Sequence, residues 1–160
     1  MKRVGIGYDI HRLEQETGAS ITLCGITIPC DHRLVAHSDG DVAFHALTDA
    51  VLGACGAGDI GEHFPDNDPR WCGAESRHFL TAALTIAAER GWRLINCDLN
   101  IIAQQPRLGP WKAALRAALA EALDLAPDAA SLKARSNEGL DAIGTSQAIA
   151  AQAVVLLDTA

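Results

Sequence analysis

The sequence contains no pair of cysteines at the Cys-x-x-Cys spacing that is typical of redox-active and thiolate zinc sites. Its cysteines are odd in number, so they cannot all pair within one chain: Cys24, Cys30, Cys55, Cys72 and Cys97. A disulfide framework is therefore not expected. We predict that the cysteines are buried free thiols of a protein in a reducing compartment.

Long hydrophobic runs are also missing. A membrane-spanning helix needs about 20 apolar residues, and the best candidate, Ala148–Leu157, is interrupted by Gln152 and followed by Asp158. The apolar stretch that follows Lys2 and Arg3 is too short for a signal peptide. We therefore expect a soluble, cytoplasmic protein.

Positive charge is scarce. The chain has 13 Lys and Arg against 20 Asp and Glu, which gives a formal net charge of −7. A surface for nucleic acid is normally basic, so this class of function is disfavoured. If the chain binds phosphate, a metal ion and backbone amides must neutralise the charge locally.

What is present is typical of one globular domain that spans residues 1–160. Nearly half of the residues are hydrophobic, and we find no repeat, linker or low-complexity tract. Patterns of period two and of helical period alternate along the chain. They predict strands at 3–11, 21–23, 26–28, 94–103 and 132–135, and helices at 41–55, 74–90 and 110–123; for 149–157 the period does not separate strand from helix.

This alternation predicts an α/β fold, more closely an α+β two-layer sandwich with a mixed sheet and helices mainly on one face. Within the first strand, Gly5 and Gly7 share one face with Asp9 and His11. The two glycines leave room for another part of the protein to approach. Asp9 and His11 then lie side by side where the strand ends.

The densest group of functional side chains lies in Leu34–Asp68, which contains three of the six histidines and six aspartates. In the helix predicted there, Asp41, His45 and Asp49 are each one turn apart and share an edge. Ser38 or Asp39 is the expected N-cap. By itself, this edge is equally compatible with a solvated helix face.

Asp9, His11 and His45 together form a candidate metal site. One carboxylate and two imidazoles suit a tetrahedral divalent ion such as zinc, and three protein ligands leave a fourth position open, as in catalytic sites. The alternative is that Asp9 and His11 only end a strand and cap a turn. The addition of His45 and the neighbouring acids favours the metal site.

Other polar residues have both a functional and a structural interpretation. His37 and Ser38 can bind phosphate at the start of the helix, or simply cap it. Asp59 and Asp66 lie in glycine-rich loops, where they can bind sugar hydroxyls or form Asx-turns. Glu138 can bind a second, harder cation or begin a helix.

Three segments extend these observations to a known family: YDIHRL near the start, AHSDGDVAFHALTDAVLGACGAGDIGEHFPDNDP in the middle, and IIAQQPRLGP. Together they resemble 2-C-methyl-D-erythritol 2,4-cyclodiphosphate synthases. The resemblance extends over nearly the whole chain, and its central segment is highly specific.

The resemblance implies a homotrimer with active sites between neighbouring subunits and a reaction of the non-mevalonate isoprenoid pathway. The substrate would be 4-diphosphocytidyl-2-C-methyl-D-erythritol 2-phosphate. Its 2-phosphate would attack the β-phosphorus, CMP would leave, and 2-C-methyl-D-erythritol 2,4-cyclodiphosphate would remain. Nucleophile and electrophile belong to one molecule, so no protein nucleophile is required.

The resemblance also implies roles for particular residues. Zn²⁺ would be bound by Asp9, His11 and His45, with Asp41 and Asp49 behind them. Glu138 would bind Mg²⁺ or Mn²⁺ at the diphosphate, and His37 and Ser136 would act in catalysis. The remaining substrate contacts would come from Ser38, Asp59, Ile60, Gly61, Phe64, Pro65, Asp66, Asn67, Asp68, Ala103, Gln104, Gln105, Pro106, Arg107, Leu108, Gly109, Arg135 and Asn137; of these, Ala103–Gly109 would form the cytosine pocket.

The sequence departs from the family pattern near its C-terminal end. Relatives have a run of threonines before the glutamate where this chain has Arg135-Ser136-Asn137-Glu138. Ser136 retains a hydroxyl at the phosphate-stabilising position. Ala142 and Thr145 replace an aromatic residue and an arginine that line a cavity near the trimer axis in relatives, so binding of an isoprenoid diphosphate there is not expected to follow.

Two other functions use the same residues. A zinc phosphohydrolase would bind the metal with the same three ligands and attack with metal-bound hydroxide. A trimeric nucleotide-binding protein would bind CDP but release no CMP. Analysis of the phosphorus-containing products separates these alternatives.

Overall fold

The computed structural model describes residues 1–160. It contains one five-stranded sheet, a separate two-stranded hairpin, and helices. The elements in chain order are β1 Lys2–Gln15, β2 Ser20–Leu23, β3 Ile26–Pro29, β4 His32–Val35, α1 Val42–Ala54, α2 Ile60–His63, η1 Pro69–Trp71, α3 Ser76–Glu89, β5 Trp92–Ile102, η2 Gly109–Trp111, α4 Lys112–Ala122, β6 Ala130–Arg135, α5 Asp141–Gly144 and β7 Ala148–Thr159.

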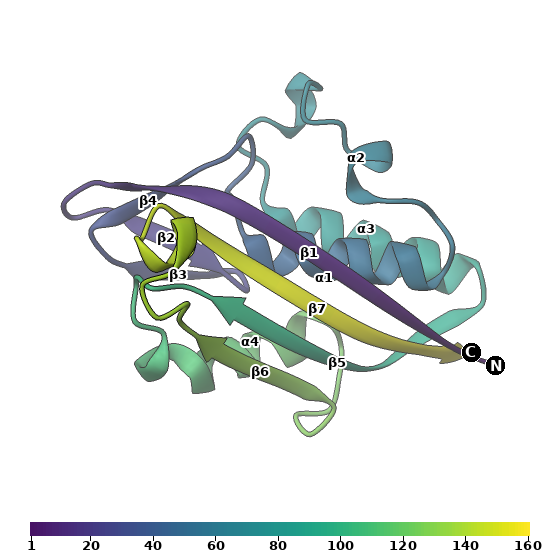
Figure 1. Ribbon diagram of the computed structural model, residues 1–160. Coiled ribbons are helices and arrows are strands. Elements are labelled where there is room, and N and C mark those ends of the chain that lie inside the picture. The colour runs from purple at the N-terminus through teal and green to yellow at the C-terminus, as the bar shows by residue number, and fades with distance from the viewer.

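The sheet has the strand order β4-β1-β7-β5-β6. Only the β5–β6 pair is parallel, and the other pairs are antiparallel, so the sheet is mixed as predicted. Figure 1 shows α1, α3 and α4 behind the sheet, with the short α5 at its front, which confirms helices mainly on one face. The two chain ends meet at one end of the sheet (Figure 1), where the Thr159 amide donates to the Met1 carbonyl.

The main core lies between the sheet and α1. Ten of the thirteen residues of α1 are buried, and this helix packs on β1 and β7. Gly5 and Gly7 explain the close approach, because a Cβ on either one would lie 1.9 Å from a backbone oxygen of α1, that of Ala50 or Ala46. The space predicted beside these two glycines is therefore filled by the protein's own helix.

The structure resolves and corrects several sequence-based predictions. Residues 149–157 belong to the strand β7, which lies at the centre of the sheet between β1 and β5. Its period was ambiguous because Ala148 and Ala150, on the face away from α1, are also buried, under Ile143 of α5. The short β4, α2 and α5 were not predicted. They have only four residues each, too few to show a period.

The predicted cap of the first helix was wrong. Asp41, not Ser38 or Asp39, is the N-cap, and its Oδ1 accepts hydrogen bonds from the backbone N–H groups of Ala43 and Phe44. The cysteines form no disulfides, in agreement with the prediction. Their predicted burial is confirmed for Cys24, Cys55 and Cys97, but Cys30 is only half-buried and Cys72 is exposed. No helix is long and apolar enough to cross a membrane.

Gly7→Ala tests the contact between β1 and α1. We expect it to lower the free energy of unfolding by about 3 kcal/mol or more, because backbone cannot yield as a flexible side chain can. The matched control is Gly53→Ala in α1, where an added Cβ meets nothing within 4 Å. We expect Gly53→Ala to leave the free energy of unfolding unchanged or to raise it by up to about 1 kcal/mol. Urea unfolding measures both; equal effects would contradict the predicted role of Gly7.

Candidate metal and phosphate site

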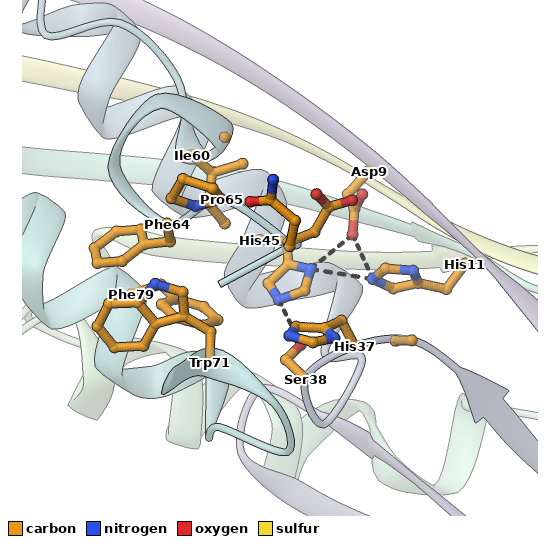
Figure 2. A pocket seen from close by; sticks show the side chains of 14 residues that line it. Asp9, His11, His37, Ser38, His45, Ile60, Phe64, Pro65, Trp71 and Phe79 are labelled. Atoms are coloured by element: carbon orange, nitrogen blue, oxygen red, sulfur yellow. Dashed lines mark hydrogen bonds and ion pairs between the residues drawn. The ribbon is translucent and has the colours of Figure 1, made fainter. Parts of the chain in front are cut away.

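Asp9 and His11 on β1 and His45 in the first turn of α1 bring three ligand atoms together. Asp9 Oδ2 lies 2.9 Å from His11 Nε2 and 3.0 Å from His45 Nδ1, and the two nitrogens are 3.0 Å apart. Figure 2 shows the three side chains converging from the strand and the helix. Asp9 and His11 point toward α1 because they share a strand face with Gly5 and Gly7.

The chemistry of this cluster fits a divalent metal ion. Ligands at zinc's usual bond lengths of about 2.0–2.1 Å are roughly 3.3 Å apart in a tetrahedron, close to the separations seen here. The cluster is also the one group of His, Cys, Asp and Glu side chains whose ligand atoms lie close enough to bind a metal. One carboxylate and two imidazoles therefore leave at least one coordination position for a ligand.

The surroundings of Asp9 favour its charged form. Burial by itself would raise the pKa of this carboxyl group, but hydrogen bonds and charge from His11 and His45 outweigh burial. The pKa of Asp9 is consequently held well below its usual range. A carboxylate that stays ionised throughout the physiological range is ready to bind a cation.

The cluster lies at one side of a cleft of about 630 Å³. His37 and Ser38, from the loop before α1, form part of its edge, so the residues predicted to bind phosphate lie beside the metal cluster. The His37 Nε2 atom lies 3.3 Å from the carbonyl oxygen of Asp68. His37 and Ser38 can both donate hydrogen bonds, and they lie next to the candidate cation site. This arrangement suits an anionic ligand.

The opposite side of the cleft is aromatic. Phe64, Trp71 and Phe79 pack with ring centroids 4.8–5.8 Å apart, and the ring of His45 lies 5.9 Å from that of Phe79 (Figure 2). An apolar wall excludes water from one side of the ligand. It also lowers the local dielectric constant, which strengthens interactions between charges in the cleft.

The structure places part of the predicted substrate-binding set in this cleft: Ile60, Gly61, Phe64, Pro65, Asp66 and Asn67. Asp59 and Asp68 do not line it. Asp59 caps α2 through the Glu62 amide, and Asp68 caps η1 and forms an ion pair with Arg70. Hydrogen bonds from Arg70 lower the pKa of Asp68. Their structural roles as turn residues are therefore seen directly.

The two aspartates expected behind the metal ligands have separate tasks. Asp41 is fully buried, and its side chain has other partners: Oδ1 caps α1, and Oδ2 accepts a hydrogen bond from the Gly25 amide at 2.8 Å. Burial raises the pKa of Asp41 to about 6. Asp49 lies on the cleft side of α1 and accepts a 2.7 Å hydrogen bond from the Ile60 amide, which ties the loop before α2 to the helix.

The segments 103–109 and 135–138 do not line the cleft. They are neighbours at the ends of the parallel strands β5 and β6, where the Ala103 amide donates to the Arg135 carbonyl and the Gly139 amide to Gln104 Oε1. Ser136 and Glu138 are exposed, and the Glu138 amide lies 3.4 Å from Ser136 Oγ. Within one chain, the residues of the candidate site thus form two separate groups.

Sequence reasoning missed four residues at the site. Ala36, Trp71 and Phe79 line the cleft, and Ser76 contacts the far edge of the His45 ring. Phe79 is spaced like a core position of α3 and Trp71 lies in a short turn, so neither gave a functional signal. Ser76 is separated from His45 by 31 positions along the chain, so only the fold brings the two together.

Fold and cluster together define an α/β protein with a candidate catalytic metal centre at one side of a cleft. The sequence model of the YgbB family matches residues 2–158. A 2-C-methyl-D-erythritol 2,4-cyclodiphosphate synthase of Halorhodospira halophila is 49% identical over 160 residues, covering 100% of this chain and 98% of its own length. The chain therefore belongs to the YgbB family, that of the cyclodiphosphate synthases.

Comparison with solved structures supports the same family assignment. A structure of 2C-methyl-D-erythritol-2,4-cyclodiphosphate synthase in a CDP-bound form is 45% identical, with a TM-score of 0.89 over 98% of this chain and 100% of that one. The bifunctional IspDF of Campylobacter jejuni matches with 38% identity and a TM-score of 0.93; this chain covers 43% of it. The chain thus spans under half the length of that bifunctional relative but nearly all of the single-function ones.

Asp49→Ala tests the link between α1 and the cleft loop. We expect the Ile60 amide to exchange with solvent about tenfold faster or more, because a hydrogen bond to a charged acceptor is worth about 1.5–3 kcal/mol. Asp49→Asn keeps a side-chain oxygen as acceptor and should stay close to the parent. Hydrogen-exchange NMR measures both. If Asp49→Ala exchanges at the parental rate, Asp49 does not fix this loop.

Proposed function

We propose that the chain catalyses the cyclisation of 4-diphosphocytidyl-2-C-methyl-D-erythritol 2-phosphate to 2-C-methyl-D-erythritol 2,4-cyclodiphosphate and CMP. The observation that supports this most strongly is the Asp9–His11–His45 cluster beside the cleft, in a chain 49% identical over its full length to a synthase of that name. In this reaction an oxygen of the 2-phosphate forms a bond to the β-phosphorus. The bond from the β-phosphorus to the oxygen of the α-phosphate breaks, and CMP leaves with that oxygen.

The protein's own residues contribute binding and orientation. His37 and Ser38 donate hydrogen bonds to the phosphate on the erythritol, and the wall of Phe64, Trp71 and Phe79 excludes water from the reacting groups. Asp9, His11 and His45 bind Zn²⁺, which, when bound, supplies Lewis-acid stabilisation of phosphoryl oxygens. No side chain attacks the substrate, because the nucleophile is part of it.

The second group of residues is proposed to bind the nucleotide. The backbone of Ala103–Gly109 offers donors and acceptors to cytosine, and relatives solved as CDP-bound forms support a cytidine ligand. Ser136 donates to the diphosphate as CMP departs, Arg135 and Asn137 lie beside it, and Glu138 binds Mg²⁺ or Mn²⁺ there. These segments lie outside the cleft of their own chain.

A trimer with sites between subunits would unite the two groups. The outer face of β1 supports such an assembly, because Val4, Ile6, Tyr8 and Ile10 are 68%, 64%, 53% and 44% exposed. Ile6 pairs with Val154 of β7, which is 41% exposed, so the apolar residues form one continuous stripe. Stripes of this kind are rare on monomers and mark surfaces covered by a partner.

Phosphorus NMR of the products tests the function. With Zn²⁺ and Mg²⁺ present, we expect cyclic diphosphate and CMP to form in equal amounts. Ring-opened phosphates would instead identify the zinc phosphohydrolase, and binding of CDP without release of CMP would identify a binding protein.

His45→Ala should lose most of its zinc and at least about 10²-fold in turnover. His32→Ala, on β4 away from the cleft, is the matched control and should match the parent.

Light scattering tests the assembly. We expect a particle of about three times 16.9 kDa. Ile6→Glu, which puts a charge in the middle of the apolar stripe, should give monomers and lose turnover, because desolvating an unpaired charge is costly. The control Thr85→Glu changes an exposed residue of α3, in the helical layer, and should remain trimeric. A monomeric parent would contradict the assembly.

A further inference from the structure

The His45 ring has two polar edges, and the metal cluster uses one of them. Its Nδ1 atom faces Asp9 and His11, and its Nε2 atom faces Ser38 in the loop before α1 (Figure 2). The same Nε2 atom also contacts Ser76 at the start of α3. On that second side, Nε2 lies 2.8 Å from Ser76 Oγ and 3.2 Å from Ser38 Oγ. The shorter of the two contacts is therefore made by Ser76, a residue that does not line the cleft.

Ser76 is the first residue of α3 and is fully buried, a rare environment for serine. Its hydroxyl is in short contact with Asp39 Oδ1, and its backbone N–H donates to Asp39 Oδ2 at 3.1 Å. The Asp41 amide also donates to Asp39 Oδ1, at 3.1 Å. Asp39 and Ser76 are thus bound to one another at two points, and the hydroxyl is fixed beside His45.

The chemistry of these groups sets the direction of each hydrogen bond. A carboxylate has no proton to donate, so Ser76 Oγ–H donates to Asp39. The serine oxygen can then accept, and its partner at 2.8 Å is His45 Nε2–H. A neutral imidazole that binds a metal through Nδ1, the atom that faces Asp9 and His11, no longer donates from Nδ1 to Asp9 and holds its proton on Nε2.

We propose that Asp39 and Ser76 are positioning residues that fix the tautomer and orientation of His45 for metal binding. The proposal deepens the proposed function and rests on its zinc site. It is the arrangement in which a metal-bound histidine donates its second N–H to a carboxylate, here with a serine hydroxyl between them. Neither Asp39 nor Ser76 lines the cleft, so we expect them to act only through His45.

This division of tasks also concerns Ser38. Its oxygen accepts from the Gly40 amide at 3.2 Å and lies farther from His45 than Ser76 does. With Ser76 accepting the Nε2 proton, the Ser38 hydroxyl is left free to donate into the cleft that it lines. Ser38 is also the nearest substitute acceptor if Ser76 is removed, and a test must allow for it.

The test is zinc affinity, measured by competition with a chromogenic chelator. We expect Ser76→Ala to bind Zn²⁺ about tenfold more weakly, and Ser38→Ala/Ser76→Ala about 100-fold more weakly, the range that such outer contacts contribute. The matched control is Thr48→Val, which removes a buried hydroxyl from the same helix; that hydroxyl bonds only to the Phe44 carbonyl. Thr48→Val should bind zinc as the parent does.

A second measurement does not depend on any variant folding. Nitrogen-15 NMR of the histidines in the zinc-loaded parent should show His45 with its proton on Nε2, and a proton on Nδ1 would overturn the proposal. Parental zinc affinity in both Ser76→Ala and the double variant would also overturn it, while leaving the synthase proposal intact. A parent that binds no zinc would overturn both proposals.

Discussion

The close contact between β1 and α1 is the constraint on which the rest of the site depends. Gly5 and Gly7 let the helix backbone approach the strand to a distance that no side chain would permit. The same strand face continues into Asp9 and His11, and the same helix begins with the turn that contains His45. A separation larger by the size of one methyl group would pull His45 away from the other two ligands. Packing and chemistry are therefore set by a single contact.

The sequence predicted the parts of the site that local rules determine. A period of two placed Asp9 and His11 on one face, and a helical period placed His45 where it could meet them. The sequence did not predict the parts of the site that depend on tertiary contacts. Asp41 was expected beside His45, but its side chain accepts a hydrogen bond from Gly25 of the β2–β3 hairpin. The role of Ser76 was likewise invisible, because its partners are Asp39 and His45, far away in the chain.

In the fold, too, the sequence predicted the elements with clear local patterns but not those that depend on long-range contacts. Long elements with clear patterns, such as α1, α3 and β5, agree with the sequence within a few residues. The central strand β7 was ambiguous because small alanines on both of its faces are buried, on one side against α1 and on the other under α5. Ile143, which covers Ala148 and Ala150, lies within the segment that departs from the family pattern. Here the divergent residues still build a small core.

The charge of the molecule raises a last physical question, because a chain with a net charge of −7 is proposed to bind a phosphorylated diphosphate. The structure answers it by giving most acids near the site their own partners. Asp41 accepts backbone amides, Asp39 binds Ser76, and Asp68 pairs with Arg70. The carboxylate that faces the metal position, Asp9, needs a cation to be satisfied fully.

Local balance therefore matters more than net charge. Apart from the exposed Asp66, the acids close to the cleft either stabilise turns and helix starts or belong to the candidate metal site, so few of them would repel an incoming phosphate. In the proposed function, the positive contribution comes from backbone amides, imidazole N–H groups and the cation, all at short range in a cleft with one apolar wall. Because such interactions weaken steeply with distance and solvent, the acidic exterior has little influence on the site. The proposed orientation of His45 then becomes important, since it would set how tightly the cation is bound.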